Sequence, residues 1–157
     1  MSGNIKRSNS SDEENILFYE GKYYELSNFS SHSVEIYGKI FQTCEHAYQA
    51  SKFGDKKIRD EVLLARSSFM AKTISLKHKG FVRKDWYDIR LSVMENILRE
   101  KVSQHYDVFE SLINTGEKTI HENSPTDLFW GCGTDLSGES HLGKIWMKIR
   151  EDIKLKK

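Results

Sequence analysis

The segment from Trp86 to Val102 constrains the fold more than any other part of the chain, because its apolar residues recur at helical spacing over its whole length. The members of this stripe and of its widened edge are Trp86, Ile89, Val93, Ile97, Met94 and Leu98. Asp85 precedes the segment and is a candidate N-cap. Because a face of this width has to be buried, the sequence predicts a core helix here.

Shorter segments also carry helical signals. Thr43 is a candidate N-cap for a helix over CEHAYQASKF, with Glu45 in its first turn and Gly54 as a natural residue after its end. Asp55 is the corresponding cap candidate for the next helix. The remaining helices are expected around residues 58–65, 69–76, 108–112 and 142–153.

The β signal is concentrated near the N-terminus. Between Ile16 and Phe41 the apolar residues form short aromatic and β-branched groups that Gly21 and Gly38 interrupt, which is typical of short strands with tight turns. A further extended piece is expected around Ile120. The sequence therefore predicts an α+β fold, mostly helical, with a small and partly antiparallel β component and no regular βαβ alternation.

The length and composition predict one domain. The chain has 157 residues, about the size of a single domain, and 38% of them are hydrophobic, which is enough for one core. Residues 1–14 are rich in Ser, Asn and acidic side chains, so we expect a disordered N-terminal tail followed by a single domain over residues 15–157.

Charge and motif patterns exclude several classes of protein. With 24 Lys and Arg against 23 Asp and Glu, the net charge of +1 disfavours non-specific binding of nucleic acid. No apolar run approaches the ~18 residues of a membrane span, and the N-terminus lacks the apolar core of a signal peptide, so we expect a cytoplasmic protein without a membrane partner. Cys44 and Cys132 are expected to be free thiols. The histidine and glycine spacings predict neither a metal site nor a nucleotide loop, so no cofactor is expected.

Two segments carry candidate functional residues. Glu45, Gln49 and Lys52 project from one face of the first predicted helix, either as an active-site face or as a solvated polar stripe. A carboxylate at a helix N-terminus tends to stay ionised, which favours Glu45 as an electrostatic stabiliser or base.

The second segment is SPTDLFWGCG, which begins a long stretch without helical period. Trp130 offers a flat face for a planar ring, and the neighbouring Gly131 allows close approach of a ligand. The alternative is that Phe129 and Trp130 belong to the core and that Asp127 caps a turn. The basic stretch over residues 77–84 could bind phosphate or could be a solvated loop.

Several motifs in order resemble the NADAR family, the YbiA-like N-glycosidases. They are LSNF at residues 26–29, TCEHAYQASKF, RKDW at residues 83–86, SPTDLFWGCG and the closing HLGKIWMKIR. The resemblance covers the chain from about residue 18 to residue 153 and implies the NADAR/YbiA-like fold.

The resemblance also implies an activity. Members hydrolyse the N-glycosidic bond between a ribose and a nitrogenous group without metal or nucleotide cofactor. For the YbiA-like branch, the implied substrates are phosphoribosylamino-pyrimidine intermediates of riboflavin biosynthesis, which the enzyme diverts to harmless products. The partner is then a small phosphorylated ribosyl metabolite. Other branches imply removal of ADP-ribose from guanine bases, with nucleic acid as the partner, and a non-catalytic module that binds ADP-ribose or a nucleotide is a third alternative.

The resemblance assigns functional positions residue by residue. The catalytic candidates are Glu45, Asp127, Trp86 and Trp130, and the substrate-binding candidates are Asn28, Phe29, Gln49, Lys52 and Gly131. In our hypothesis one carboxylate faces the sugar, the other activates water or protonates the leaving nitrogen, and the tryptophans stack on the base.

Two lysines and two departures from the family pattern also bear on function. Lys52 is a candidate for a phosphate or for attack on the anomeric carbon, with Lys72 as a less favoured substitute. The chain reads Ser-Leu-Lys at residues 75–77 where the family favours Gly-Arg, and it has Ser140-His141 in place of an Asn before the closing Leu-Gly. Both departures bear on the choice of substrate.

Overall fold

The computed structural model describes residues 10–11 and 14–156. Contacts within the chain divide it into two compact units, which we call the central unit (residues 28–106) and the terminal unit (the segments before residue 28 and after residue 106). Of the predicted N-terminal tail, Ser10–Ser11 form a strand, and residues 1–9 and 12–13 lie outside the described residues. The single domain over residues 15–157 stays a prediction.

A small sheet and a long helix form the frame of the terminal unit. Its elements are β1 (Ser10–Ser11), β2 (Asn15–Phe18), the 3-10 helix η1 (Tyr24–Leu26), α5 (Tyr106–Asn114), which begins at the boundary, β5 (Thr119–Glu122) and α6 (His141–Leu155). The strand order is β1-β2-β5, antiparallel between β1 and β2 and parallel between β2 and β5. The parallel pair joins segments that are about a hundred residues apart in the chain, with Ile16 opposite Ile120.

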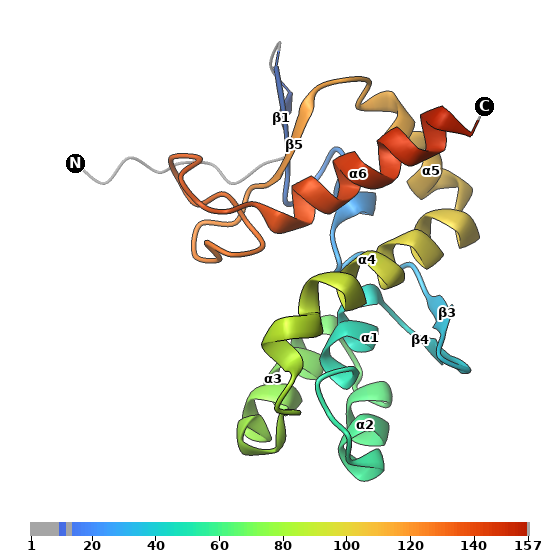
Figure 1. Cartoon of the computed structure of the whole chain (residues 1–157), viewed down its shortest axis with the longest axis vertical. Helices are drawn as coiled ribbons and strands as arrows, with labels where there is room; N and C mark the ends of the chain where they lie inside the picture. The colour runs from blue at the N-terminus through green and yellow to red at the C-terminus, as the bar shows by residue number, and fades with distance from the viewer. Residues whose placement is uncertain (1–9, 12–13, 157) are drawn as a thin grey trace. The chain divides into compact units, whose positions relative to one another are not determined.

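Helix α6 packs directly on β5, as Figure 1 shows. Gly143 permits this approach, because a Cβ atom at that position would overlap the carbonyl group of Ile120. Trp146 is fully buried in the same helix, and its indole N–H donates to the carbonyl oxygen of Leu26 at 3.0 Å. The apolar face predicted near the C-terminus is therefore the one that covers the sheet.

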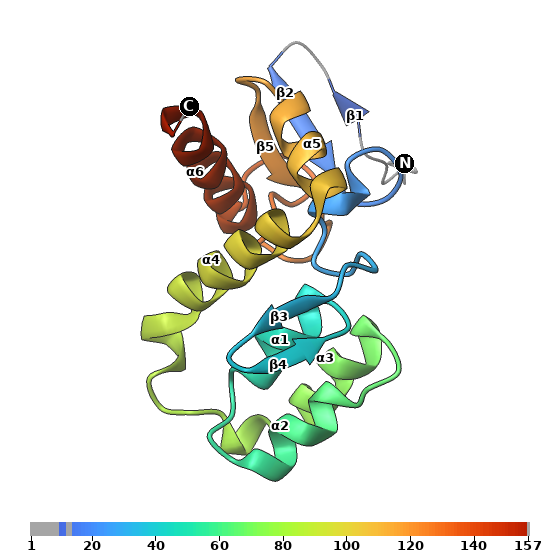
Figure 2. The ribbon, with the colours of Figure 1, turned by 90° about the vertical axis from the view of Figure 1, so that its right-hand side faces the viewer.

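The central unit consists of a hairpin and a group of helices. Its elements are β3 (Val34–Ile36), β4 (Lys39–Phe41), α1 (Cys44–Ala50), α2 (Lys56–Leu63), α3 (Ser68–Lys77), the 3-10 helix η2 (Lys79–Phe81) and α4 (Trp86–Gln104). The antiparallel hairpin turns at Tyr37 and Gly38, which both have positive φ. Helix α1 contacts the hairpin as well as α2, α3 and α4, and all of its residues are buried (Figure 2). It is the centre of this unit.

The predicted caps agree with the structure at two helices and differ at a third. The Thr43 hydroxyl accepts from the backbone N–H of His46, and the Asp55 carboxylate accepts from two N–H groups at the start of α2. The Asp85 side chain makes no capping bond to α4; instead it forms a bidentate ion pair with Arg83. An adjacent guanidinium offers two charge-assisted bonds, which outweigh one bond to a backbone amide.

Two boundaries also differ from the prediction. Helix α1 ends at Ala50 rather than at Phe53, and Phe53 instead forms an isolated β-bridge with Val82. The segment around Tyr24, expected to be extended, forms the 3-10 helix η1 after Tyr23, whose φ is +67°. The remaining architecture confirms an α+β fold with dominant helices and a small, partly antiparallel β component.

Two further expectations can be compared with the structure. Cys44 and Cys132 are both buried, and neither forms a disulfide bond. Across the described residues, no helix combines the length and the apolar character that crossing a membrane requires.

Candidate active site

Helix α1 carries a polar face that is withdrawn from solvent. Glu45 keeps only 7% and Gln49 only 3% of its surface exposed, whereas the side chains of a solvated stripe would be largely accessible. The interpretation of these two residues as a solvated stripe is therefore wrong. Burying a carboxylate and an amide costs free energy unless they are paired, so their partners are informative.

Glu45 and Gln49 pair with each other across one helical turn. The amide Nε2 of Gln49 donates to Oε1 of Glu45 at 2.7 Å, and the backbone N–H of Glu45 donates to the carbonyl oxygen of Asn28 at 3.1 Å. Because the carboxylate oxygen needs a donor, this bond fixes which way the Gln49 amide points. Its Oε1, like Oδ1 of Asn28, is buried without a hydrogen-bond partner among the described residues. Two acceptors of this kind indicate a place for a donor such as a hydroxyl group.

Lys52 lies beyond the last turn of α1 against two aromatic rings. Its Nζ is 5.4 Å from the ring centroid of Tyr48 and 6.0 Å from that of Trp86, both within cation–π range. The two rings contact each other at 5.1 Å between centroids. Tyr48 is thus part of the site, although the sequence analysis did not single it out; its place one turn before Lys52 was the available signal.

The charges around Lys52 act in opposite directions on its pKa. Burial lowers the pKa of the Lys52 ammonium below its usual value, and the negative charge of Glu45 opposes this fall. The positive charges of Lys72 and Arg90 add to it. Glu45, Lys52 and Lys72 therefore belong to one electrostatic environment. All three are candidate functional residues in the sequence.

Trp86 and Phe29 differ in what they can offer to a ligand. Trp86 begins α4, is only 4% exposed and presents its ring to Tyr48, so it forms a wall rather than an open stacking platform. Phe29 is 38% exposed and follows Asn28, whose amide Nδ2 donates to the sulfur of Met94 in α4 at 3.3 Å. The Asn28 side chain is thereby tied to α4, and its backbone to α1.

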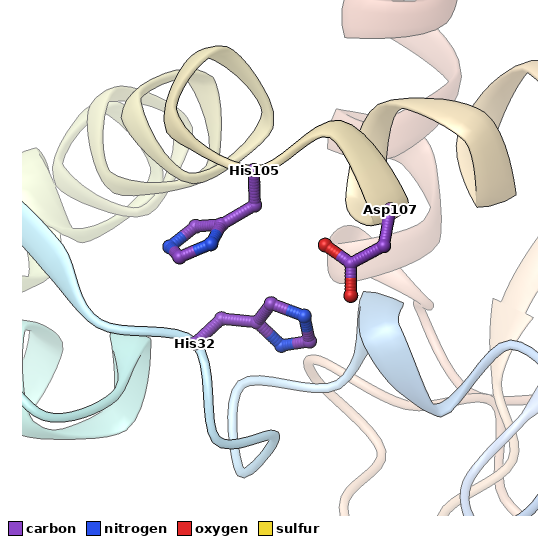
Figure 3. Close-up of side chains that lie close together, drawn as sticks. All are labelled: His32, His105 and Asp107. Carbon is purple, nitrogen blue, oxygen red and sulfur yellow. The ribbon is translucent and has the colours of Figure 1, made fainter.

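The segment that follows Phe29 is held to α4 by a chain of polar groups. The buried Nζ of Lys101 donates to the Ser30 hydroxyl at 2.8 Å, and this oxygen lies 2.8 Å from Nδ1 of His32. The His32 ring meets the edge of the His105 ring at 5.0 Å between centroids (Figure 3). Nε2 of His105 in turn lies 2.5 Å from the carbonyl oxygen of Ser33. These contacts hold the stretch that carries Asn28 and Phe29.

His46 anchors the opposite face of α1. Its Nε2 donates to the carbonyl oxygen of Ala65 at 2.9 Å, because a carbonyl can only accept. Nδ1 of the neutral ring then accepts from the Thr43 hydroxyl at 2.8 Å, and this hydroxyl accepts from Ser68 at 2.9 Å. The sequence places His46 beside the functional face but does not reveal this network, because Ala65 and Ser68 lie about twenty residues away.

The terminal unit holds the second group of candidates on the segment 124–140. Oδ1 of Asp127 accepts from the backbone N–H groups of Phe129 and Trp130 at 3.0 and 2.9 Å. The Trp130 ring packs edge-on against Phe129 at 4.8 Å, and the Phe129 ring lies 4.4 Å from that of His141. Asp127 therefore caps a turn, as the alternative interpretation expected, while its second carboxylate oxygen leaves room for a further role.

Gly131 sits where no side chain fits. A Cβ atom there would lie 2.6 Å from the carbonyl oxygen of Asp127 and 2.8 Å from the Cβ of Ser124. The Gly131 carbonyl accepts from the N–H of Ser140 at 3.0 Å, and the Trp130 carbonyl from Leu142 at 3.2 Å. Although the segment has no helix or strand, backbone bonds fasten it to the start of α6.

The predicted residues thus fall into two groups. The central unit brings together Asn28, Glu45, Gln49, Lys52 and Trp86, with Phe29 next to them in the chain, and the terminal unit brings together Asp127, Trp130 and Gly131. The assignment of these residues to catalysis and binding stays a prediction.

The fold and the central group define an α+β protein with a buried carboxylate, two unpaired amide oxygens and a cation against aromatic rings. Residues 17–154 match the NADAR domain, and the chain belongs to the NADAR family. The resemblance inferred from the sequence motifs is confirmed.

Several bacterial proteins are similar in sequence to this chain. The chain is 37% identical over 144 residues to an N-glycosidase of Nostoc punctiforme, covering 88% of this chain and 92% of that protein. It is 32% identical over 144 residues to the N-glycosidase YbiA of Escherichia coli, covering 90% of each. It is 38% identical over 143 residues to a riboflavin biosynthesis protein of Vibrio vulnificus, covering 90% of this chain but only 39% of that protein.

A solved structure agrees with the fold. The NMR structure of the Escherichia coli protein YbiA superposes with a TM-score of 0.84 at 30% identity, over 94% of this chain and 89% of that one.

Proposed function

We propose that this protein is an N-glycosidase that hydrolyses the bond between a ribose and a nitrogen atom in a phosphorylated ribosylamine. Family membership and the names of its relatives support this class of reaction. The observation that carries the proposal is the buried Glu45 carboxylate, which Gln49 orients at 2.7 Å and which shares its environment with Lys52. A structural helix has little use for such a carboxylate.

Glu45 acts on the sugar. Cleavage of an N-glycoside passes through an oxocarbenium-like transition state, in which positive charge develops at C1 and the ring oxygen of the ribose. A fixed carboxylate in a site of low water content stabilises that charge more than it stabilises the neutral ground state. Because the Gln49 amide and the N-terminal position in α1 hold Glu45, little reorganisation is needed as the charge develops.

The unpaired amide oxygens bind the ribose. Oδ1 of Asn28 and Oε1 of Gln49 are buried acceptors, and the hydroxyl groups of a ribose supply donors that satisfy them. A substrate without these hydroxyls would leave both oxygens desolvated and unpaired, so this pair contributes specificity for a sugar. The Lys52 ammonium, held against Tyr48 and Trp86, binds the phosphate group of the substrate.

For Asp127 and Trp130 of the terminal unit we propose the roles that the family resemblance implies. The free oxygen of Asp127 either accepts a proton from the attacking water or delivers one to the leaving nitrogen; water adds to C1, and the C1–N bond breaks. Trp130 stacks on the heterocycle of the leaving group, and Gly131 allows the tight turn against Asp127 and Ser124 that holds Trp130. Trp86 excludes water from the sugar side.

Within this class we propose phosphoribosylamino-pyrimidine intermediates of riboflavin biosynthesis as substrates. The name of the Vibrio vulnificus relative supports this choice. The alternative, ADP-ribosylated guanine in nucleic acid, would be supported by a strongly cationic surface along residues 77–84. There, however, Lys77 pairs with Glu61 at 3.8 Å and Arg83 with Asp85 at 2.6 Å, so part of the positive charge is neutralised.

Glu45→Gln tests the proposal. The amide keeps the size of the side chain and an oxygen that can accept from Gln49, but removes the charge that stabilises the transition state. We expect kcat for release of ribose 5-phosphate from a phosphoribosylamino-pyrimidine to fall about 10²- to 10⁴-fold, with the Tm close to that of the parent protein.

Glu35→Gln is the matched control, because Glu35 is an exposed glutamate of the same unit in β3. Its kcat should equal that of the parent. Near-parental turnover by a folded Glu45→Gln variant would refute the assignment of Glu45, and absence of hydrolysis by the parent protein on both candidate substrate classes would refute the enzymatic function.

A further inference from the structure

A cavity of about 420 Å³ lies in the central unit, beside the C-terminal end of α1. The hairpin contributes Tyr37, Lys39 and Phe41, and α2 contributes Lys56, Arg59 and Asp60. Glu45, Gln49 and Trp86 are not among its lining residues, so it is separate from the site proposed above. Its volume falls in the range of small-molecule sites, about 300–1,000 Å³.

Cationic side chains dominate the charge of this cavity. Lys39, Lys56, Arg59 and Arg83 line it together with a single carboxylate, that of Asp60. The whole chain, in contrast, has a net charge of only +1. Positive charge is therefore concentrated here, which favours an anionic ligand.

Two of these four cations are paired with carboxylates, so the net positive charge of the cavity comes from Lys39 and Arg59. Arg83 pairs with Asp85, and Oδ2 of Asp60 accepts from Nζ of Lys56 at 2.7 Å. The bond to Lys56 lowers the pKa of the Asp60 carboxyl below its usual value, and the positive charges of Lys39 and Arg59 lower it further. Both cations therefore lie close enough to Asp60 to act on its carboxyl group.

Arg59 is held in a fixed orientation. Its Nη1 donates to the carbonyl oxygens of Phe53 at 3.2 Å and Gly54 at 2.6 Å, the residues that connect α1 to α2. These bonds use one nitrogen of the guanidinium, whereas Nε and Nη2 carry three further N–H donors. A guanidinium oriented in advance offers paired donors to a phosphate at a lower entropic cost than a flexible lysine does.

The remainder of the lining is aromatic and apolar. Phe53 is 2% exposed and forms part of the wall together with Phe41, while Tyr37 is 59% exposed at the turn of the hairpin. Flat apolar side chains next to cations suit a ligand that joins a planar ring to an anionic group.

We propose that this cavity is a second ligand site, which binds a phosphate monoester that carries a planar heterocycle, a molecule of the size and chemistry of a mononucleotide. Lys39 and Arg59 bind the phosphate, and the aromatic residues contact the ring. The site is independent of N-glycoside hydrolysis, since none of its phosphate-binding residues belongs to the proposed catalytic group.

Calorimetric titration of the whole chain with three probes tests the ligand class. AMP has both parts of the proposed ligand, inorganic phosphate has only the anion, and adenosine has only the ring. We expect AMP to bind at least tenfold more tightly than either of the other two. Equal affinity for AMP and adenosine, or no binding of AMP, would overturn the proposal.

Two glycines allow a steric test of the location. A Cβ atom on Gly54 meets nothing within 4 Å, and its φ is not in the left-handed range, so Gly54→Leu adds a bulky side chain at the lining of the cavity without backbone strain. Gly80 has the same properties but does not line the cavity, which makes Gly80→Leu the matched control. We expect Gly54→Leu to weaken AMP binding more than tenfold and Gly80→Leu to leave it unchanged.

A pair of lysines supplies the electrostatic test. Lys39→Gln removes a cation from the cavity, and Lys57→Gln removes an exposed cation of α2 that does not line it. We expect Lys39→Gln to weaken AMP binding about two- to fivefold, the value of an ion pair at an exposed site, and Lys57→Gln to have no effect. Because AMP also carries the phosphate and ribose that the proposed active site binds, both comparisons are repeated in a Lys52→Met background, where the losses with Gly54→Leu and Lys39→Gln should persist. A loss with Lys52→Met but not with Gly54→Leu would move the AMP site to the proposed active site and refute the second site.

Discussion

Helix α1 and the segment 124–140 each carry candidate functional residues, but they hold them in different ways. In α1, regular helical geometry aligns Glu45 and Gln49, and the side chains bond to each other. In the segment 124–140 there is no regular element, and the Asp127 carboxylate itself supports the backbone by accepting from Phe129 and Trp130. Function and structure are therefore separable in the helix and coupled in the loop.

This difference determines what a substitution reports. A change at Glu45 alters chemistry in a backbone that Thr43 and His46 hold independently. A change at Asp127 or Gly131 alters the path of the chain as well.

The largest effect on stability is expected for Gly131→Ala. The added Cβ would lie 2.6 Å from a backbone oxygen and 2.8 Å from Ser124, so the backbone of the segment has to move. We expect the free energy of unfolding, measured by urea titration, to fall by about 3 kcal/mol or more. Gly80→Ala, where space is open, should change it by less than about 1 kcal/mol. An unchanged free energy for Gly131→Ala would show that the segment is looser than its contacts indicate.

Asp127 separates support of the backbone from chemistry. Asp127→Asn keeps the oxygen that accepts from Phe129 and Trp130 but loses the charge, whereas Asp127→Ala loses both. We expect kcat to fall about 10²-fold or more in both variants, and the free energy of unfolding to fall by about 1 kcal/mol in the alanine variant alone. If Asp127→Asn retained parental kcat, the role of Asp127 would be limited to capping the turn.

The sequence predicts α1 well because its signals are local. Thr43 caps the helix as expected, and the spacing of Glu45 and Gln49 sets them on one face. Periodicity could not decide whether that face is buried, because burial depends on α2, α3 and α4 packing around it. The bond from the Glu45 backbone N–H to Asn28 is likewise a tertiary contact without a local signal.

The loop and the sheet were less predictable for the same reason. The motif around Asp127 indicated both a turn and a functional role, and the structure confirms the turn. The parallel pairing of Ile16 with Ile120 joins distant segments, so no short pattern reports it. Asp85 lies at the N-cap position of α4, but its carboxylate forms an ion pair with Arg83, two residues away, and makes no capping bond. Competition of this kind is decided by geometry that the sequence does not contain.

His46 tests how firmly α1 is held independently of its functional face. His46→Phe keeps an aromatic ring but removes both nitrogens, which leaves the Ala65 carbonyl and the Thr43 hydroxyl without these partners. We expect the free energy of unfolding to fall by about 2 kcal/mol. His78→Phe, which breaks a pair with Glu61 on the surface, should cost less than about 1 kcal/mol. Equal costs would mean that the buried network adds nothing to the support of α1.

The smallest effect concerns the pH dependence of substrate binding at Lys52. Burial lowers the pKa of Lys52, so its ammonium loses its proton at a lower pH than an ordinary lysine does. If the ammonium binds the substrate phosphate, KM is low below this pKa and rises severalfold as the pH increases through it, while kcat stays constant. If Lys52 instead attacks C1 as an amine, kcat increases over the same range.

We expect the first behaviour, because the rings of Tyr48 and Trp86 both stabilise the cation. Lys52→Arg retains the charge at every accessible pH, so its KM should not change across the range. Lys72→Gln removes a positive charge that lowers the pKa of Lys52, and the rise in KM should therefore move to higher pH. Steady-state kinetics from pH 7 to pH 10.5 would measure all three proteins, and a kcat that rises with pH in the parent but not in Lys52→Arg would assign Lys52 as the nucleophile. Lys52 would then form a covalent bond to C1 of the ribose, and Glu45 would stabilise the positive charge that develops there.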